Sequence, residues 1–331
     1  MSHLKAAVVG VGYLGHFHLQ KYQALDGVQL VAIVDTNDER GKYLSERYNV
    51  KHYSDYFEII GCVDIVSIVV PPKEHFKVAL DFLNGGVHCL IEKPITESVA
   101  QAEELISVAQ KNSCILQVGH LERFNPSVKK LQEIVVNPVA IKSKRFAKFQ
   151  KRGSDVDVIL DLMIHDIDIL LSLSKSRIKT VQAIGATIIS PHVDIANANI
   201  EFYDGLVAEL SASRVSSEAL RESTFILPDR RVTVNYLTHE TIESTLDGRQ
   251  KFEETNLNLL FGKEGAKLDI LYDEISSFVD SVKGGTLPLV TGEDGRKALE
   301  LAILISQKIK NVADSDRKQA FKYGMDTNHL I

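Results

Sequence analysis

The chain has 331 residues, of which 44% are hydrophobic and 25% are charged, and its formal net charge at pH 7 is −6. This is the composition of a globular protein long enough for two domains of ordinary size. The negative charge argues mildly against a nucleic-acid-binding surface, and no stretch approaches the roughly 18 uninterrupted apolar residues of a membrane span. The opening "MSHLKAAVVGVG" enters an apolar strand without the features of a signal peptide. We therefore expect neither nucleic acid nor a membrane as a partner, and a cytoplasmic location.

Cysteines and histidines near the N-terminus give no pattern for a metal site. Cys62, Cys89 and Cys114 have no metal-ligand spacing and cannot all pair within one chain, which favours a reducing compartment. His16 and His18 stand at i and i+2 on an expected helix, so they point to different faces. For these two histidines we expect ordinary solvent or loop contacts, and for the whole chain no metal.

The first third of the chain alternates short apolar runs, rich in Val and Ile, with amphipathic stretches. The alternation predicts a doubly wound parallel sheet covered by helices on both faces. The expected strands are 5–9, 28–34, 63–70, 87–91 and 114–118, and the amphipathic stretches between them include 38–48 and 97–111.

The first expected strand leads directly into "GVGYLG", in which Gly10, Gly12 and Gly15 form the pattern G-x-G-x-x-G. The first glycine permits a tight turn, the second lets the backbone approach a pyrophosphate, and the third allows close packing of helix on strand. The helix that follows presents its N–H groups and positive dipole end to the phosphates. Because the motif lies between a strand and a helix, it predicts a dinucleotide site that includes Tyr13 and Leu14.

Asp35 ends the second expected strand, about 20 residues past Gly15, where such sites place an acidic residue. Its carboxylate would accept hydrogen bonds from the adenosine ribose hydroxyls and repel a 2′-phosphate. The next basic residue, Arg40, lies inside an expected helix. The sequence therefore favours NAD over NADP.

Glu92, Lys93 and Pro94 follow the 87–91 run, at the carboxyl end of an expected strand. Ligands of open α/β sheets bind at that edge. Pro94 ends the strand, and the Lys93–Pro94 bond is a candidate cis peptide. By residue type alone a solvated Lys–Glu pair is the better interpretation, but the position beside a nicotinamide site favours a functional Lys93.

The stretch "DLMIHDIDIL" (161–170) is predicted to be a buried helix that nevertheless carries acidic residues. Asp161, His165 and Asp168 stand at i, i+4 and i+7 and form one stripe. Carboxylates are rarely buried without a partner. The stripe is therefore either a structural Asp–His pair or one side of a pocket. The neighbouring stripe is wholly apolar: Leu160, Ile164, Ile167 and Leu171.

Together, "GVGYLG", "EKP" and "DLMIHDID" resemble the Gfo/Idh/MocA family of NAD(P)-dependent oxidoreductases, and the resemblance runs to "PLVTGEDGRKALELAI" at 288–303. It implies that Lys93 contacts substrate and cofactor. It also implies that His165 is the general base, and Asp161 completes the site. Asp168 fills a further acidic position, and either Asp161 or Asp168 would orient the imidazole. The resemblance places Glu92 at the cofactor as well.

One loop departs from the family pattern. Members usually have a threonine or serine before the proline of the fourth-strand loop, whereas this chain reads "VVPPKEH". Pro71, Pro72 and His75 therefore occupy the expected cofactor-lining loop.

The sequence changes character after about residue 120, and we divide it into 1–121, an NAD-binding domain, and 122–331, a substrate-binding and oligomerisation domain. Asn125 before Pro126 reads as a helix start. Asp204–Gly205 predicts a hairpin. These signals predict an α+β domain with a large open, mainly antiparallel sheet that carries the 160–173 helix on one face. By resemblance, the other face joins copies of the chain into a homodimer or homotetramer. The expected strand regions are 139–150, 180–189, 196–214 and 231–237.

A basic stretch in the second domain has two interpretations, a solvated sheet face or a cation-lined cleft mouth for a dianionic substrate. In the second case Arg152 would reach the substrate, together with Arg123, Asn125 and Asp168. The stretch comprises Lys142, Lys144, Arg145, Lys148, Lys151 and Arg152.

Within the family, "GHLERFNP" and "RGSDVDVILDLMIHDIDIL" most resemble the UDP-N-acetylglucosamine 3-dehydrogenase branch. That branch oxidises the sugar 3-hydroxyl before an aminotransferase acts, in lipid A assembly. Oxidation of a free polyol such as inositol, or of a UDP-N-acetyl-glucosaminuronic acid, is the alternative. A non-catalytic NAD sensor is less favoured, because it would need neither Lys93 nor His165.

Overall fold

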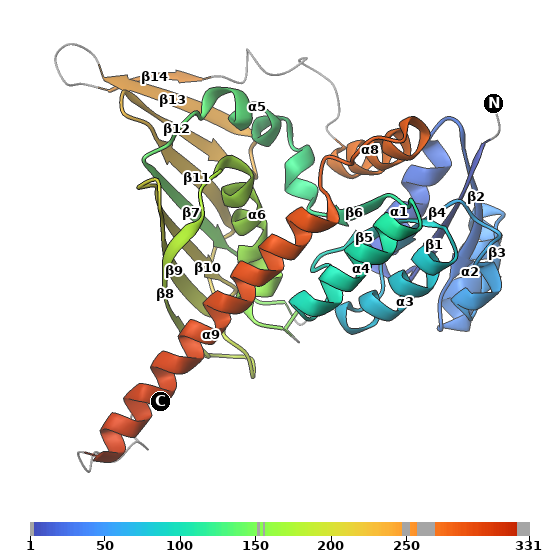
Figure 1. Ribbon diagram of the computed structural model, residues 1–331, viewed down its shortest axis with the longest axis horizontal. Helices are drawn as coiled ribbons and strands as arrows, with labels where there is room; N and C mark the ends of the chain where they lie inside the picture. The colour runs from blue at the N-terminus through green and yellow to red at the C-terminus, as the bar shows by residue number, and fades with distance from the viewer. Residues whose placement is uncertain (1–2, 151–152, 155, 247–251, 257–268, 323–331) are drawn as a thin grey trace. The chain divides into compact units, whose positions relative to one another are not determined.

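The computed structural model describes residues 3–150, 153–154, 156–246, 252–256 and 269–322. The chain forms two compact units, the first from Met1–Asn125 with Gly265–Leu299 and the second from Pro126–Glu264 with Glu300–Ile331 (Figure 1). This differs from a single division after residue 121. Helix α8 (Ile270–Gly284) belongs to the first unit, where it packs against α1 (Tyr13–Ala24) through an apolar cluster that includes Leu19, Ile275 and Phe278.

The first unit is built on a sheet whose strands are parallel throughout the described residues, in the order β3-β2-β1-β4-β5-β6. The predicted doubly wound parallel sheet is confirmed. Only the short edge strand β3 had no signal in the sequence, because three residues are too few to show a period. The strands are β1 (Leu4–Val9), β2 (Val28–Val34), β3 (Lys51–Tyr53), β4 (Ile65–Ile68), β5 (His88–Glu92) and β6 (Leu116–Gly119).

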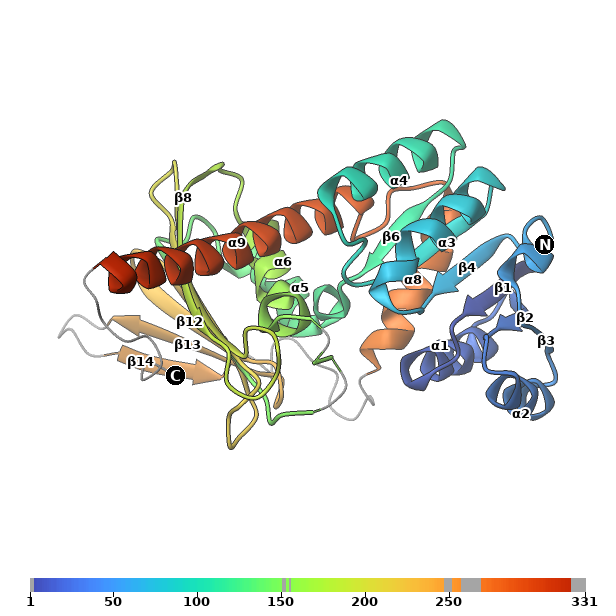
Figure 2. The same ribbon diagram turned by 90° about the horizontal axis from the view of Figure 1, so that it is seen from below.

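Helices cover both faces of this sheet, α1 and α8 on one face and α3 and α4 on the other (Figure 2). Local chemistry fixes the helix starts. The Asn37 side chain caps α2, and Ser98 and Gln101 form a capping box on α4. The remaining bounds are α2 (Asp38–Tyr48), α3 (Pro72–Asn84) and α4 (Val99–Lys111), with short 3₁₀ turns η1 (Tyr56–Ile59) and η2 (Leu121–Phe124).

The second unit contains a sheet ordered β14-β13-β12-β11-β7-β10-β9-β8. Strands β7 and β10 pair in parallel, and the other neighbours pair antiparallel, which confirms the predicted mainly antiparallel sheet. The strands are β7 (Ala140–Phe146), β8 (Ile178–Ala186), β9 (Ile195–Phe202), β10 (Val207–Ser213), β11 (Leu220–Ile226), β12 (Arg230–Asn235), β13 (Glu240–Leu246) and β14 (Phe252–Asn256).

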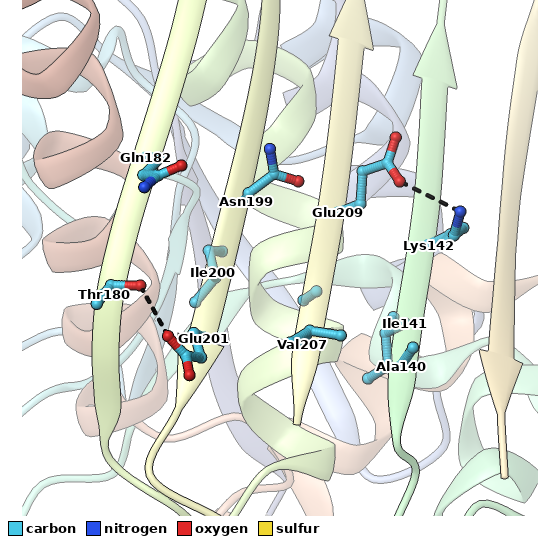
Figure 3. Close-up of a pocket in the computed structure, with 11 residues that line it drawn as sticks. Ala140, Ile141, Lys142, Thr180, Gln182, Asn199, Ile200, Glu201, Val207 and Glu209 are labelled. Atoms are coloured by element: carbon cyan, nitrogen blue, oxygen red, sulfur yellow. Dashed lines mark hydrogen bonds and ion pairs between the residues drawn. The ribbon is translucent and has the colours of Figure 1, made fainter. Parts of the chain in front are cut away.

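One face of this second sheet carries helices and the other is open. A π-helical turn, η3 (Ile159–Met163), continues into α6 (Ile164–Leu173), and both pack on β7 and β10. Helix α5 (Pro126–Ile134) starts at the proline, as predicted, and the long α9 (Gly292–Lys322) follows α8 along the chain. On the open face, a hollow of about 340 Å³ lies over β7, β8, β9 and β10 (Figure 3).

Candidate functional site

The glycine-rich loop has a backbone that other residues could not adopt. Gly10 has φ +85°, and a Cβ there would lie 2.5 Å from the carbonyl oxygen of Val69. A Cβ on Gly15 would clash with the carbonyl oxygen of Gly10. By contrast, a Cβ on Gly12, the N-cap residue of α1, would meet nothing within 4 Å. Neighbouring backbone therefore packs tightly against Gly10 and Gly15, whereas the space beside Gly12, at the N-terminus of α1, is open. These residues, with Tyr13 and Leu14 in the first turn of α1, fit a dinucleotide pyrophosphate.

Asp35, at the end of β2, is 5% exposed and its carboxylate is fully engaged. The N–H groups of Val11 and Asn37 donate to it at 3.0 and 2.8 Å, and the guanidinium of Arg40 donates through Nε at 3.0 Å and Nη2 at 2.8 Å. Burial by itself would raise the pKa of Asp35, but these bonds outweigh it and hold the pKa below its usual value. The carboxylate is therefore charged at neutral pH.

Arg40 was expected to lie in its helix without a part in the site. The structure instead folds it back onto Asp35, because the cap at Asn37 brings the first turn of α2 over the end of β2. The Arg40 side chain remains 44% exposed. A ribose hydroxyl that donates to Asp35 would therefore replace one of these four hydrogen bonds. If it replaced a bond from Arg40, the Arg40 guanidinium would lie beside the ribose.

The loop after β4 carries three of the predicted cofactor-binding residues. Pro71 is the N-cap of α3 and Pro72 its first residue, so this helix starts with prolines, which have no hydroxyl, at the position predicted to line the cofactor. His75 is 1% exposed, and its ring nitrogens contact the carbonyl oxygens of Pro94 (2.8 Å) and Val70 (2.9 Å). Its contact with the cofactor stays a prediction. His75 ties the β4 loop to the turn that follows β5.

Glu92 and Lys93 end β5, and the expected cis peptide between Lys93 and Pro94 is present. The Glu92 carboxylate accepts a hydrogen bond from His18 Nε2 at 3.2 Å and from the Lys93 backbone N–H at 3.3 Å. His18 is fully buried, so the expectation of solvent or loop contacts is wrong for this residue. His16 contacts the hydroxyl of Tyr48 at 2.6 Å.

Arg123 and Asn125, substrate contacts expected in a domain that starts at residue 122, belong to the first unit and are both buried, at 7% and 0% exposure. Arg123 lies in η2 and donates to the carbonyl oxygen of Leu289 at 3.5 Å, which ties η2 to the segment before α9. Their contact with a substrate stays a prediction.

In the second unit, the Asp–His stripe begins in a π-helical turn and not in a regular α-helix. Asp161 lies within η3 and His165 within the first turn of α6, and both are half-buried. Asp168, one turn on, is 2% exposed. Single π turns are rare and frequently mark functional sites, because they shift side chains relative to the helix.

The loop before η3 is held against Asp161 by a buried ion pair that the sequence interpretation missed. Gly153 has φ +78°, and a Cβ there would lie 3.0 Å from Oδ1 of Asp161. Arg214 donates to the carbonyl oxygens of Gly153 (2.7 Å) and Val156 (2.6 Å) and pairs with Asp194 at 2.9 Å. No local pattern links these residues: Asp194 immediately precedes β9, Arg214 immediately follows β10, and Gly153 and Val156 lie in the loop before η3.

The basic stretch splits between the two faces of β7. Lys142 and Lys144 are exposed on the open face, as the solvated-face interpretation expects, and Lys142 pairs with Glu209 at 3.4 Å (Figure 3). Arg145 is buried on the opposite face and forms a two-bond pair with Asp166, at 2.9 and 3.0 Å. Lys148 is exposed, and Lys151 and Arg152 lie outside the described residues.

The candidate residues thus form two groups. Strand ends β1, β2, β4 and β5 gather the loop around Gly10, Asp35 and Lys93 at one edge of the first sheet. Asp161, His165 and Asp168 lie together in the second unit. Within the part of the chain that the structure describes, no three His, Cys, Asp or Glu side chains are grouped to hold a metal ion, and no helix could cross a bilayer.

Comparison with known proteins matches both parts of the chain to one family. Residues 4–120 match the model of an oxidoreductase family with an NAD-binding Rossmann fold, Gfo/Idh/MocA, and residues 137–234 match the C-terminal domain of that family. A UDP-N-acetylglucosamine 3-dehydrogenase of Acidithiobacillus ferrooxidans is 34% identical over 311 residues, which cover 92% of this chain and 97% of the relative. A solved structure of the Acidithiobacillus enzyme superposes with a TM-score of 0.86 over 94% of this chain and 99% of that one, at 33% identity.

A myo-inositol 2-dehydrogenase of Thermotoga maritima is more distant, at 25% identity over 93% of this chain and 96% of the relative. The similarity to both relatives extends over more than nine tenths of this chain. The chain belongs to the Gfo/Idh/MocA oxidoreductase family and carries its NAD-binding domain.

Proposed function

We propose that this oxidoreductase uses NAD to oxidise the 3-hydroxyl of UDP-N-acetylglucosamine to a ketone. The observation that carries the proposal is the near full-length similarity to a UDP-N-acetylglucosamine 3-dehydrogenase, which exceeds the similarity to an inositol dehydrogenase. The presence of Lys93 and His165 supports an enzyme over an NAD sensor.

In this proposal His165 removes the proton from the sugar hydroxyl, because a neutral imidazole can act as a general base. Asp161, or Asp168, orients the imidazole and stabilises its charged form. Lys93 hydrogen-bonds the reacting oxygen and stabilises the developing charge. When bound, NAD accepts the hydride from the same carbon. The glycine-rich loop binds the pyrophosphate and Asp35 the adenosine ribose, and Arg123, Asn125 and Arg152 are the proposed substrate contacts.

The substrate is tested by measuring NADH formation from NAD with UDP-N-acetylglucosamine, its uronic acid and myo-inositol in parallel. An aminotransferase and glutamate should be present, because formation of a 3-keto sugar is uphill and the trap pulls it forward. We expect turnover with UDP-N-acetylglucosamine. Turnover of myo-inositol alone would refute the nucleotide sugar and leave the dehydrogenase chemistry standing. A product consumed by transamination would fit a step toward lipid A.

The cofactor preference is expected to depend on Asp35 and Arg40 together. Wild-type protein should bind NAD more tightly than NADP, because the charged Asp35 opposes a 2′-phosphate. Asp35→Ser removes that charge and frees the Arg40 guanidinium, so the affinity for NADP relative to NAD should rise roughly 10-fold to 100-fold, since a charged hydrogen bond is worth about 1.5–3 kcal/mol. Calorimetric titration of both cofactors measures the ratio. Adding Arg40→Ala should cancel the gain, and equal wild-type affinities would contradict the role of Asp35.

We also propose that the open face of the second sheet joins copies of this chain into a homodimer or homotetramer. Val207, which lines the hollow of Figure 3, is 48% exposed, and Ile184, two residues beyond Gln182 on β8, is 62% exposed. Exposed apolar side chains next to paired polar groups are common at interfaces. Ile184→Asp with Val207→Asp should convert the oligomer to a monomer in sedimentation velocity. A wild-type monomer at micromolar concentration would refute the interface.

A reducing, cytoplasmic setting is part of the proposal. The three cysteines are free thiols, with Cys62 exposed and Cys89 and Cys114 buried. Burial raises the pKa of the Cys89 and Cys114 thiols, which keeps them unreactive.

A further inference from the structure

A chain of buried hydrogen bonds runs beneath Glu92, under the face of the first sheet that α1 and α8 cover. Tyr22 Oη lies 2.9 Å from Ser67 Oγ, Ser67 Oγ lies 3.1 Å from His18 Nδ1, and His18 Nε2 lies 3.2 Å from Glu92 Oε1. Tyr22, Ser67 and His18 have no exposed surface. Buried polar groups are costly unless they are satisfied, so the chain constrains where each proton can be.

The proton positions follow from counting donors and acceptors. Ionised Glu92 can only accept, so His18 donates from Nε2. If Nδ1 were also protonated, Ser67 Oγ would accept from it, and the hydroxyl hydrogen of either Ser67 or Tyr22 would then have no acceptor among the described residues. With a neutral His18, Tyr22 donates to Ser67, Ser67 donates to Nδ1, and every donor is used. All the hydrogen bonds then point toward Glu92.

The Glu92 carboxylate is fixed from its other sides as well. The Lys93 N–H donates to Oε2 at 3.3 Å. Gly119, its neighbour on β6, has no side chain, and a Cβ there would lie 3.1 Å from Cδ and from both carboxylate oxygens. Burial opposes the charge on Glu92, but the hydrogen bond from His18 and the nearby charge of Lys93 outweigh it and hold the pKa of Glu92 below the usual value. A negative charge therefore lies next to Lys93 in the chain, in a position fixed on three sides.

We propose that His18 is a positioning residue for Lys93, acting through Glu92: the Tyr22–Ser67–His18 chain holds the Glu92 carboxylate in its slot over Gly119, and the carboxylate holds Lys93 charged and in place for the reacting oxygen. The inference rests on the proposed role of Lys93. It adds His18 and Tyr22 of α1 and Ser67 of β4 to the residues that support catalysis. In this role none of the three touches substrate or cofactor.

Two isosteric variants separate positioning from simple packing. Glutamine at position 18 places an amide N–H where Nε2 was and can still donate to Glu92. Asparagine is shorter and places its polar atoms only where Nδ1 was, so it can contact Ser67 but not Glu92. His18→Gln should keep kcat within about 3-fold of wild type, and His18→Asn should lower it by roughly 10-fold to 100-fold, the range seen for the outer partners of metal ligands. The dissociation constant for NAD should be unchanged in both. Equal losses in the two variants, or a loss in NAD affinity alone, would overturn the proposal.

Matched controls lie in the same unit. His88→Asn, at the opposite end of β5, keeps the Nδ1-level acceptor for the Ile115 N–H and should leave kcat unchanged. Gly119→Ala pushes on the Glu92 carboxylate without altering His18 and should lower kcat, whereas Gly284→Ala, whose Cβ would meet only Thr286 at 3.7 Å, should not. Wild-type kcat in Gly119→Ala would contradict the inference that the position of the Glu92 carboxylate over Gly119 matters for catalysis.

A measurement independent of turnover distinguishes failure of this inference from failure of the proposed function. Nitrogen-15 NMR of the imidazoles at neutral pH should show His18 as the neutral tautomer protonated at Nε2, with no exchange with solvent on the seconds timescale. An imidazolium, or a proton on Nδ1, would overturn the chain whatever the substrate is. If His18 has the expected tautomer but Lys93→Ala retains full turnover, the chain stands as structure and the catalytic role of Lys93 fails.

Discussion

Replacing His165 with alanine is expected to lower kcat by roughly 10²–10⁴, the usual range for a positioned acid or base. Its half-buried ring lies one turn after Asp161, at the junction of the π turn and α6. Lys93→Ala should cause a loss of the same order. The dissociation constant for NAD, measured by calorimetry, should change little in either variant, because the glycine-rich loop and Asp35 supply the expected binding contacts.

His192→Ala is the matched control for the first of these variants. His192 is another half-buried histidine of the second unit, in the loop before β9, and its removal should leave kcat unchanged. If His165→Ala retains wild-type turnover, the stripe of Asp161, His165 and Asp168 is structural. If His192→Ala loses as much as His165→Ala, the loss reports on folding of the unit.

Replacing Glu274 with glutamine is expected to stabilise the protein, increasingly so at higher pH. Glu274 lies on α8 with no exposed surface, and neither carboxyl oxygen has a hydrogen-bond partner among the described residues. Burial, followed by the nearby charge of Glu92, raises its pKa well above 4.5. Because the folded state binds a proton that the unfolded chain releases above pH 4.5, stability falls as pH rises toward the folded pKa.

Glutamine has the shape of the protonated acid and does not titrate. The gain in unfolding free energy over wild type should therefore grow by about 1.4 kcal/mol per pH unit above 4.5, until the folded pKa is reached. Urea unfolding at several pH values between 5 and 8 measures it, with the exposed Glu104→Gln on α4 as the control that should give a small, flat difference. A Glu274→Gln variant that is less stable at every pH would show that the carboxylate is ionised and paired.

Much of the first unit could be predicted because its signals are local. Strands β1, β2, β4, β5 and β6 appear as short apolar runs, and residues 38–48 and the Asn125–Pro126 boundary mark helices at their observed positions. In the second unit, the helix predicted at 160–173 was placed correctly. Its π turn was not predicted, because a shift in backbone hydrogen bonding leaves the apolar pattern almost unchanged.

Buried polar pairs were the main omissions. The sequence shows that Arg145, Asp166 and Arg214 are charged, and that such groups need partners when buried. It does not show which partners, since the Arg145–Asp166 and Arg214–Asp194 pairs join different elements. The same reason accounts for His18, which was given the wrong surroundings, for His75, whose contacts with two backbone carbonyls were not foreseen, and for Arg40, whose bond to Asp35 depends on how α2 begins.

The sequence by itself determined the dinucleotide loop. Gly10 and Gly15 are required by contacts with nearby backbone, and an alternation of strands and helices around them allows few other folds. Tertiary structure alone decided what lies beneath Lys93. His18 reaches Glu92 across 74 residues, and α8, which carries Glu274, packs on α1 although the second unit separates them in the chain. Contacts between residues so far apart in the chain depend on which apolar faces of helices and strands pack together. The same local sequence pattern is compatible with more than one such packing.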